Sequence, residues 1–159
     1  MALVMDRDRL NRFLGEVFPQ IADQVRVESV TRDELLARML VSDRHLRPGG
    51  TVSGPAMFAL ADVAIYLAIL ARIGEVALAV TTNASIDFMR KPEAGRDLLA
   101  SCRILKLGRV LAVGETLIRS EGVEAPVARC SMTYSIPPGQ GERQERPRKP
   151  GGDERYSDT

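Results

Sequence analysis

One carboxylate stands out in this sequence because it interrupts a long apolar segment. Asp62 is the single charged residue between Pro55 and Ala71, and no lysine or arginine lies three or four positions away from it. Burying an uncompensated carboxylate is costly, so such a group is either satisfied by a remote partner or kept for chemistry. Asp62 is therefore a candidate general base or nucleophile, with a structural pairing to a distant arginine or to backbone amides as the alternative.

A glycine-rich stretch leads directly into the same segment. Residues 49–54 read Gly-Gly-Thr-Val-Ser-Gly, and Ser53 and Pro55 suit the cap and first turn of a helix. Backbone N–H groups at a helix start can bind developing negative charge, and glycine lets a substrate approach closely. An amide donor and a carboxylate on one helix are more informative together than either is alone.

The surrounding pattern predicts one α+β domain. Apolar residues recur at helical spacing from Leu10 to Ile21, with the regular helix ending near Phe18, and the apolar helix from Pro55 to Ala71 needs burial on nearly every side. Strands arranged in hairpin order favour an antiparallel sheet that curves around that helix. The strand-like segments are residues 24–30, 35–41, 83–88, 97–107, 110–119 and 127–136, with a loop at 44–51.

Composition limits the function classes. The chain has 159 residues, 45% hydrophobic and 27% charged, which is typical of one soluble domain. Its net charge of +1 and 4% aromatic content argue against a nucleic-acid partner. Residues 137–159 are rich in proline, glycine and charge, so we expect a domain over 1–136 and a disordered charged tail over 137–159.

The cysteine and histidine content narrows the chemistry further. Cys102 and Cys130 have neither metal-ligand nor disulfide-framework spacing, and His45 is the single histidine, so we expect no metal site. His45 lies in a predicted loop, where we expect it at the surface. With no signal-peptide pattern at the N-terminus, a cytoplasmic location is expected. The 17-residue apolar segment with a central aspartate is predicted to pack on strands and not to cross a membrane.

Three stretches resemble a known family. Residues 47–55, Arg-Pro-Gly-Gly-Thr-Val-Ser-Gly-Pro, followed by Leu-Ala-Asp at 60–62, resemble the signature of the PaaI-like hotdog acyl-CoA thioesterases. Residues 86–92, Ile-Asp-Phe-Met-Arg-Lys-Pro, and the turn at Gly108-Arg109 are similar to two further stretches of that family. The resemblance covers about residues 35–136. It implies a hotdog fold, an acyl-CoA substrate, a homodimer or dimer of dimers, and no cofactor.

The resemblance also implies roles for individual residues. Asp62 would be the general base for water or a direct nucleophile, and the backbone N–H of Gly54 would polarise the thioester carbonyl. Thr81 falls where relatives often hold the Ser or Thr that positions water, with Thr82 as the neighbouring candidate. The phosphates of coenzyme A would be bound by three cations, Arg90, Lys91 and Arg109. The alternative is that these three residues are solvated surface charges.

Two departures from the family signature keep a second hypothesis open. The family's Asn is Arg47 here, and its His is Ser53. Arg47 cannot accept a hydrogen bond and could instead pair with Asp62 or with a substrate carboxylate, whereas Ser53 could donate or only cap the helix. We expect an acyl-CoA thioesterase, with a non-catalytic acyl-CoA or acyl-ligand binding protein as the alternative. A hydratase would need a histidine beside the acid and is disfavoured.

The spacing of the acid and the amide predicts where the site lies. Gly54 and Asp62 are eight residues apart, which is about 12 Å along a helix. A base and an oxyanion donor must both reach one thioester, so one helix cannot supply both to a single site. Two antiparallel helices related by a two-fold axis can. We therefore expect two equivalent sites, each shared between two subunits.

Overall fold

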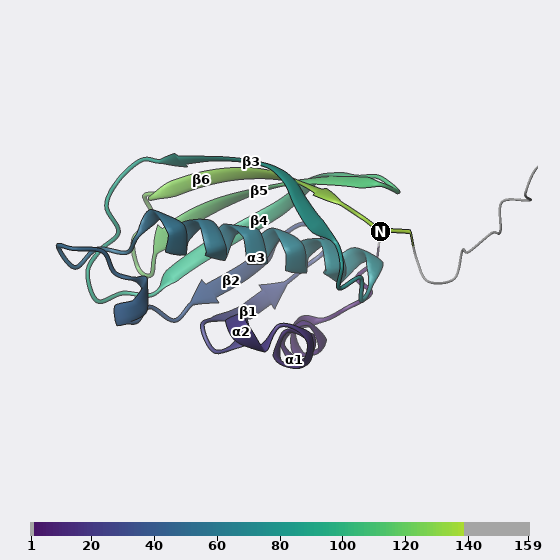
Figure 1. Ribbon diagram of the computed structural model, residues 1–159, viewed down its shortest axis with the longest axis horizontal. Coiled ribbons are helices and arrows are strands. Elements are labelled where there is room, and N and C mark those ends of the chain that lie inside the picture. Colours follow the sequence, from purple (N-terminus) through teal and green to yellow (C-terminus); the bar gives the residue numbers. More distant parts are fainter. Residues whose placement is uncertain (1, 139–159) are drawn as a thin grey trace, which may run out of the picture.

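The computed structural model describes residues 2–138, and residues 139–159 of the tail predicted at 137–159 lie outside them. Within residues 2–138, four helical segments and six strands follow one another (Figure 1). In chain order they are α1 (Arg7–Val17), α2 (Pro19–Ala22), β1 (Val25–Val30), β2 (Leu35–Met39), the 3-10 turn η1 (Asp43–His45), α3 (Gly54–Ile73), β3 (Val80–Phe88), β4 (Leu98–Leu107), β5 (Leu111–Ser120) and β6 (Ala128–Ser135).

The six strands form one antiparallel sheet in the order β1-β2-β4-β5-β6-β3. The sheet curves around α3, which lies along its concave face (Figure 1). This is the hotdog arrangement, so the predicted fold class is confirmed. The predicted strands are each within about one to three residues of the observed ones, because alternation locates a strand better than it locates the strand's ends.

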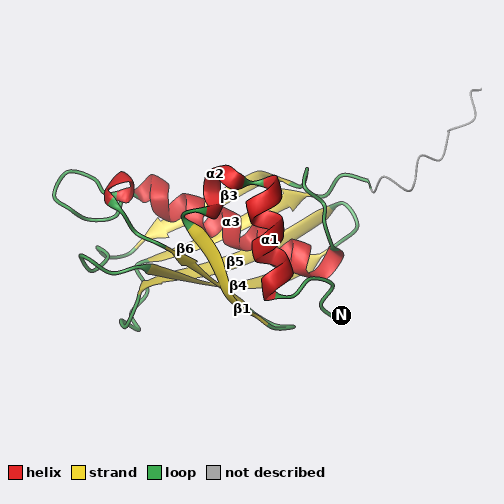
Figure 2. Cartoon of the chain, turned by 90° about the horizontal axis from the view of Figure 1, so that it is seen from below, coloured by secondary structure: helices red, strands yellow, loops and turns green. Residues whose placement is uncertain are grey.

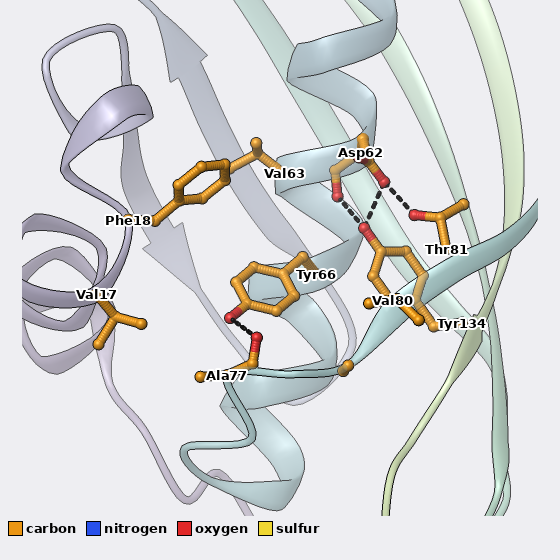
Figure 3. Close-up of a pocket in the computed structure, with 10 residues that line it drawn as sticks. Val17, Phe18, Asp62, Val63, Tyr66, Ala77, Val80, Thr81 and Tyr134 are labelled. Atoms are coloured by element: carbon orange, nitrogen blue, oxygen red, sulfur yellow. Dashed lines mark hydrogen bonds between the residues drawn. The ribbon is translucent and has the colours of Figure 1, made fainter.

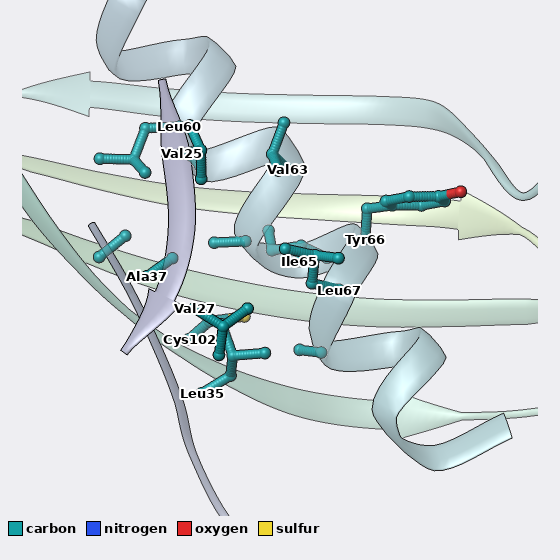
Figure 4. Packing of buried hydrophobic residues seen from close by; sticks show 14 of the residues in the cluster. Val25, Val27, Leu35, Ala37, Leu60, Val63, Ile65, Tyr66, Leu67 and Cys102 are labelled. Atoms are coloured by element: carbon teal, nitrogen blue, oxygen red, sulfur yellow. The ribbon is translucent and has the colours of Figure 1, made fainter. Parts of the chain in front are cut away.

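Helix α3 forms the centre of the hydrophobic core. Leu60, Ile65 and Leu67 are fully buried, and their neighbours on the sheet include Val27 and Leu35 (Figure 4). By length and composition alone this helix could cross a membrane, but 72% of its most apolar 18-residue stretch is buried inside the protein. The sheet thus supplies the burial that the apolar pattern demands.

The N-terminal helical segment covers the β1 edge of the molecule (Figure 2). Asp6 caps α1 by accepting a hydrogen bond from the Arg9 N–H, and the helix ends at Val17 because Pro19 follows. The predicted apolar stripe is only partly buried. Leu10, Phe13 and Leu14 are buried, whereas Val17 is 46% exposed, and Ile21 belongs to the separate helix α2.

Strand β3 is an outer strand of the sheet and pairs with β6 alone. Seven of its nine residues are exposed, including Val80 and Phe88 at its two ends. The alternating pattern of β3 does not bury one face of the strand, because α3 contacts the strand without covering it and no further strand within residues 2–138 pairs with its outer edge. Long, exposed edge strands with apolar side chains are ready to pair with another strand.

His45 is buried, so the expectation that it lies at the surface was wrong. Its Nδ1 accepts a hydrogen bond from the Ser42 N–H at 2.9 Å, and its Nε2 lies 2.8 Å from the Gln24 side-chain oxygen. With Nδ1 as acceptor, the imidazole is neutral and donates from Nε2. The His45 carbonyl accepts from the Ser53 N–H, so this residue holds the loop that leads into α3.

Candidate functional site

Asp62 is held by two hydroxyl groups. Thr81 donates from Oγ1 to Asp62 Oδ1 at 2.5 Å, and the Tyr134 hydroxyl contacts the same carboxylate oxygen (Figure 3). The Tyr134 hydroxyl also lies 2.8 Å from the backbone carbonyl oxygen of Asp62. No arginine or lysine pairs with Asp62 among residues 2–138. The partners of the Asp62 carboxylate are thus two hydroxyl groups, and not the remote arginine or backbone amides that the sequence suggests.

The register of two strands brings these hydroxyls together. Thr81 on β3 is the direct cross-strand partner of Tyr134 on β6, and both strands pass the middle of α3. The register shifts between Thr81 and Asn83, so the extra residue of this bulge is Thr82. The Thr82 hydroxyl bonds to the Thr133 carbonyl on the exposed side. The structure therefore places Thr81 at the carboxylate and Thr82 away from it.

Asp62 lies at the wall of a largely apolar cavity of about 300 Å³. Residues from α1, α3, β3 and β6 line it, together with Phe18 after α1 and the segment between α3 and β3 (Figure 3). Tyr66 donates a hydrogen bond to the Ala77 carbonyl and so fixes that segment. The lining residues are Val17, Phe18, Asp62, Val63, Tyr66, Ala77, Ala79, Val80, Thr81 and Tyr134.

Gly54 lines a second cavity, of about 600 Å³, at the start of α3. Ser53 caps the helix by accepting from the Ala56 N–H at 3.3 Å, which is the second of the two roles considered from the sequence. The Gly54 N–H is one of the first helical donors, which have no partner within the helix. A Cβ at Gly54 would lie 3.2 Å from the ring of Phe88, so there is little room for a side chain beside this N–H group.

The predicted cations are divided between two ends of α3. Arg47, Arg90 and Lys91 line the Gly54 cavity, beside Phe88 and Met89. Arg109 lies apart from them, with Ile73 and Val76 at the other end of α3. Within the described residues Arg47 forms no ion pair with Asp62. Arg47 is thus available to a ligand of the Gly54 cavity.

Burial sets the protonation of the groups around Asp62. The pKa of the Tyr134 hydroxyl is raised, chiefly by burial and then by the charge of Asp62, so Tyr134 remains a donor at neutral pH. Burial also raises the pKa of Tyr66. Burial raises the pKa of the Cys130 thiol to about 11, and Asp62 adds to that effect. Cys130 is therefore an inert neighbour and not a nucleophile at neutral pH.

Sequence reasoning missed two parts of this site. Tyr134 carried no signal beyond its place in an alternating strand, and its partner Asp62 is 72 residues away. The sequence places Val17 and Phe18 at the end of a helix, and nothing local indicates that they border a cavity. No group of three His, Cys, Asp or Glu side chains that could hold a metal ion occurs within the described part of the chain. The chemistry available is therefore that of a carboxylate, hydroxyls, a helix-start amide and cations.

Comparisons with known proteins bear on the fold and the family of this chain. A crystal structure from Silicibacter sp. TM1040, provisionally described as a thioesterase, is 63% identical, covers 87% of this chain and 96% of its own, and has a TM-score of 0.82. The phenylacetic acid degradation protein PaaI from Thermus thermophilus, in a point-mutant form, is 28% identical over 74% of this chain and 98% of its own, with a TM-score of 0.64.

Two further comparisons concern the sequence. A Caenorhabditis elegans protein provisionally described as an esterase is 24% identical over 131 residues, which is 82% of this chain and 77% of its own. The family model of the thioesterase superfamily matches residues 49–136, the span that contains the glycine-rich loop, α3 and β3 to β6. The resemblance drawn from residues 47–62 and 86–92 is thereby confirmed, and the chain belongs to the thioesterase superfamily.

Proposed function

We propose that the protein hydrolyses acyl-CoA thioesters in a site that two subunits share. The observation that carries this proposal is the separation of Gly54 and Asp62 into two different cavities of one chain. One cavity holds an oriented carboxylate beside apolar walls, and the other holds a helix-start amide beside three cations. The first cavity could bind the acyl group and supply the acid, and the second could bind the charged nucleotide and supply the oxyanion donor.

The exposed surface of the single chain favours a second copy as the missing half. Pro55, Phe58, Ala59 and Asp62 form an exposed to half-buried stripe at helical spacing on the first part of α3. The stripe adjoins β3, the exposed edge strand that contacts α3. Two copies related by a two-fold axis would pair β3 with β3 and place the start of one α3 beside the middle of the other. Gly54 of one subunit would then face Asp62 of its partner.

The same two-fold arrangement accounts for the position of Arg109. Antiparallel α3 helices would bring the Ile73 end of one subunit toward the Gly54 end of the other. Arg109 of one subunit would thereby approach Arg90 and Lys91 of its partner, and the three predicted cations would surround one nucleotide. Arginine and lysine are suited to phosphate groups by charge and by their hydrogen-bond donors.

Hydrolysis would proceed with the carboxylate and the amide on opposite sides of the thioester. If Asp62 acts as a base, it removes a proton from water as the water oxygen bonds to the carbonyl carbon. The Gly54 N–H binds the resulting oxyanion, the carbon–sulfur bond breaks, and the proton held by Asp62 passes to the departing thiolate. If Asp62 acts as a nucleophile, its oxygen bonds to the carbonyl carbon, the carbon–sulfur bond breaks and coenzyme A leaves as the thiolate; water then hydrolyses the resulting anhydride. A single turnover in ¹⁸O-labelled water tests these routes, because label enters Asp62 only from an anhydride that water attacks at the Asp62 carbonyl carbon.

The substrate class follows from the Asp62 cavity. Its walls are mainly aliphatic and aromatic, and among its lining residues only Asp62 carries a charge. An uncharged apolar acyl group, aliphatic or aromatic, fits these walls, whereas an acyl group ending in a second carboxylate would meet Asp62 without a compensating cation. We expect medium-sized apolar acyl groups to be the preferred substrates.

The test is a panel of acyl-CoAs assayed with a chromogenic thiol reagent that detects released coenzyme A. The protein's own thiols should contribute little, because burial raises the pKa of Cys102 to about 12 and that of Cys130 to about 11. Apolar acyl-CoAs should turn over, and Asp62→Asn should abolish the turnover. Absence of turnover across the whole panel would contradict the proposal.

A non-catalytic acyl-CoA-binding role is the second candidate. Arg47 and Ser53, which replace the family's Asn and His, favour it because Ser53 caps the helix and Arg47 can bind a phosphate without taking part in chemistry. Isothermal calorimetry with a non-hydrolysable acyl-CoA thioether separates the two functions. Tight binding combined with no turnover of the matching thioester would identify a binding protein.

A further inference from the structure

We propose that Tyr134 is a positioning residue that fixes the Asp62 carboxylate for attack, an inference that rests on the proposed thioesterase function. Tyr134 lies on β6 at the wall of the apolar cavity, and the residue is 3% exposed. Its hydroxyl points at Asp62 and contacts both the carboxylate and the backbone carbonyl of that residue (Figure 3).

These contacts join the sheet to the helix at the reactive group. A tyrosine hydroxyl has one proton, which Tyr134 shares between Asp62 Oδ1 and the Asp62 carbonyl oxygen. The raised pKa of Tyr134 keeps that proton in place at neutral pH. Tyr66 stacks on the Tyr134 ring, with ring centroids 6.3 Å apart, and so limits its movement. The Tyr134 hydroxyl is therefore fixed in position and protonated at neutral pH.

Two donors on one oxygen leave the other oxygen for chemistry. Thr81 and Tyr134 both donate to Oδ1, whereas Oδ2 has no hydrogen-bond partner among residues 2–138. Fixing Oδ1 on two sides sets the plane of the carboxylate and selects Oδ2 as the atom that meets water or the thioester carbon. Thr81 alone would leave the carboxylate free to turn about a single contact.

Tyr134→Phe is the direct test, because it removes the hydroxyl and keeps the stacked ring. For the best acyl-CoA of the panel we expect kcat to fall by roughly 10- to 100-fold while KM stays within about twofold, the signature of an interaction needed for chemistry and not for binding. The matched control is Ser131→Ala, which removes a hydroxyl from β6 on the opposite side of the strand. An unchanged kcat in Tyr134→Phe, or an equal loss in Ser131→Ala, would overturn the proposal.

A double-mutant cycle locates the effect on the carboxylate. If Thr81 and Tyr134 fix the same oxygen, Tyr134→Phe should cost less in a Thr81→Val background than in the wild type, because the carboxylate is already loosened. Losses in kcat that simply multiply would show that Tyr134 acts independently of the Asp62 contact and would contradict the assignment.

A measurement without turnover separates this inference from the thioesterase proposal itself. Three-bond NMR couplings of Asp62 report whether its side chain occupies one rotamer or several. We expect one rotamer in the wild type and in Ser131→Ala, and averaging in Tyr134→Phe, with the folded state of each variant checked by its melting temperature. A single unchanged rotamer in Tyr134→Phe would refute the positioning role. Absence of turnover in the wild type, with the couplings as expected, would instead refute only the catalytic function.

Discussion

Gly54 and Asp62 lie on the same helix but line different cavities of the chain. Gly54 starts α3 and borders the cavity that carries Arg47, Arg90 and Lys91, whereas Asp62 borders the apolar cavity beside Tyr66. Their separation of eight residues corresponds to about 12 Å of helix. A thioester bound by one chain alone could therefore contact only one of them at reacting distance.

This relationship predicts complementation between two inactive variants. Asp62→Asn removes the acid, and Gly54→Pro removes the amide proton at a position where proline suits the first helical turn. After subunit exchange, each heterodimer holds one intact site, so an equal mixture should regain about a quarter of the wild-type turnover. The measurement is acyl-CoA hydrolysis before and after exchange.

Gly54→Ala is the control for that experiment. Alanine keeps the N–H but brings the same Cβ toward the Phe88 ring, 3.2 Å away. It should keep most of the activity, which would assign the loss in Gly54→Pro to the missing proton and not to crowding. Exchanged mixtures that stay as inactive as the separate variants would place both groups in one subunit's site and contradict the shared site.

The cations of the Gly54 cavity should recognise the nucleotide of the substrate. Replacing Arg90 and Lys91 with alanine should raise KM for acyl-CoA by roughly 10-fold with little change in kcat, since uniform binding is lost. The same variants should hydrolyse a short thioester without the nucleotide as the wild type does. Arg103→Ala, an exposed cation on β4, is the control. Equal effects on both substrates would reject the assignment.

Phe18 should limit the size of the acyl group. It follows the end of α1, lines the Asp62 cavity and is 38% exposed, so Phe18→Ala should enlarge the cavity without removing a residue of the buried core (Figure 3). The ratio of kcat/KM for a long acyl-CoA to that for a short one should rise by roughly 10-fold. Leu105→Ala, at an exposed site on β4, should leave the ratio as it is. No change in Phe18→Ala would show that the acyl group lies elsewhere.

His45 should make stability fall in mild acid. Burial is the main cause that lowers its pKa below the ordinary value of 6.5, and the charge of Arg44 adds to it. The folded protein therefore keeps His45 neutral where the unfolded chain already binds a proton. This contribution to stability is fully present above about pH 6.5 and is lost as pH falls toward the lowered pKa of the folded state.

Melting temperatures measured across that range test the role of His45. Protonation of Nδ1 would also remove the acceptor of the Ser42 N–H. His45→Gln should melt lower at neutral pH, but its melting temperature should fall less between about pH 7.5 and pH 5.5 than that of the wild type. An identical acid-induced decrease in both proteins would assign the effect to other groups.

Local sequence patterns predict the main elements and the two main chemical groups. The apolar pattern of α3 and the alternation of the strands are local, and they indicated a helix wrapped by an antiparallel sheet. Asp62 and Gly54 were visible because a carboxylate in an apolar helix and a glycine at its start are exceptions to that pattern. The main stretch of the family resemblance, residues 47–62, contains both of them.

Contacts between distant segments determine which side chains meet Asp62 and which do not. Tyr134 reaches it through strand register, and the bulge at Thr82 selects Thr81 in place of its neighbour. Arg109 and Arg90 carry the same side chain, but Arg109 lies near the Ile73 end of α3 and Arg90 near the Gly54 end. Periodicity specifies which face a residue occupies within its own element. Periodicity does not specify the distance between two elements or the register in which two strands pair. Packing between distant parts of the chain sets the distance and the register.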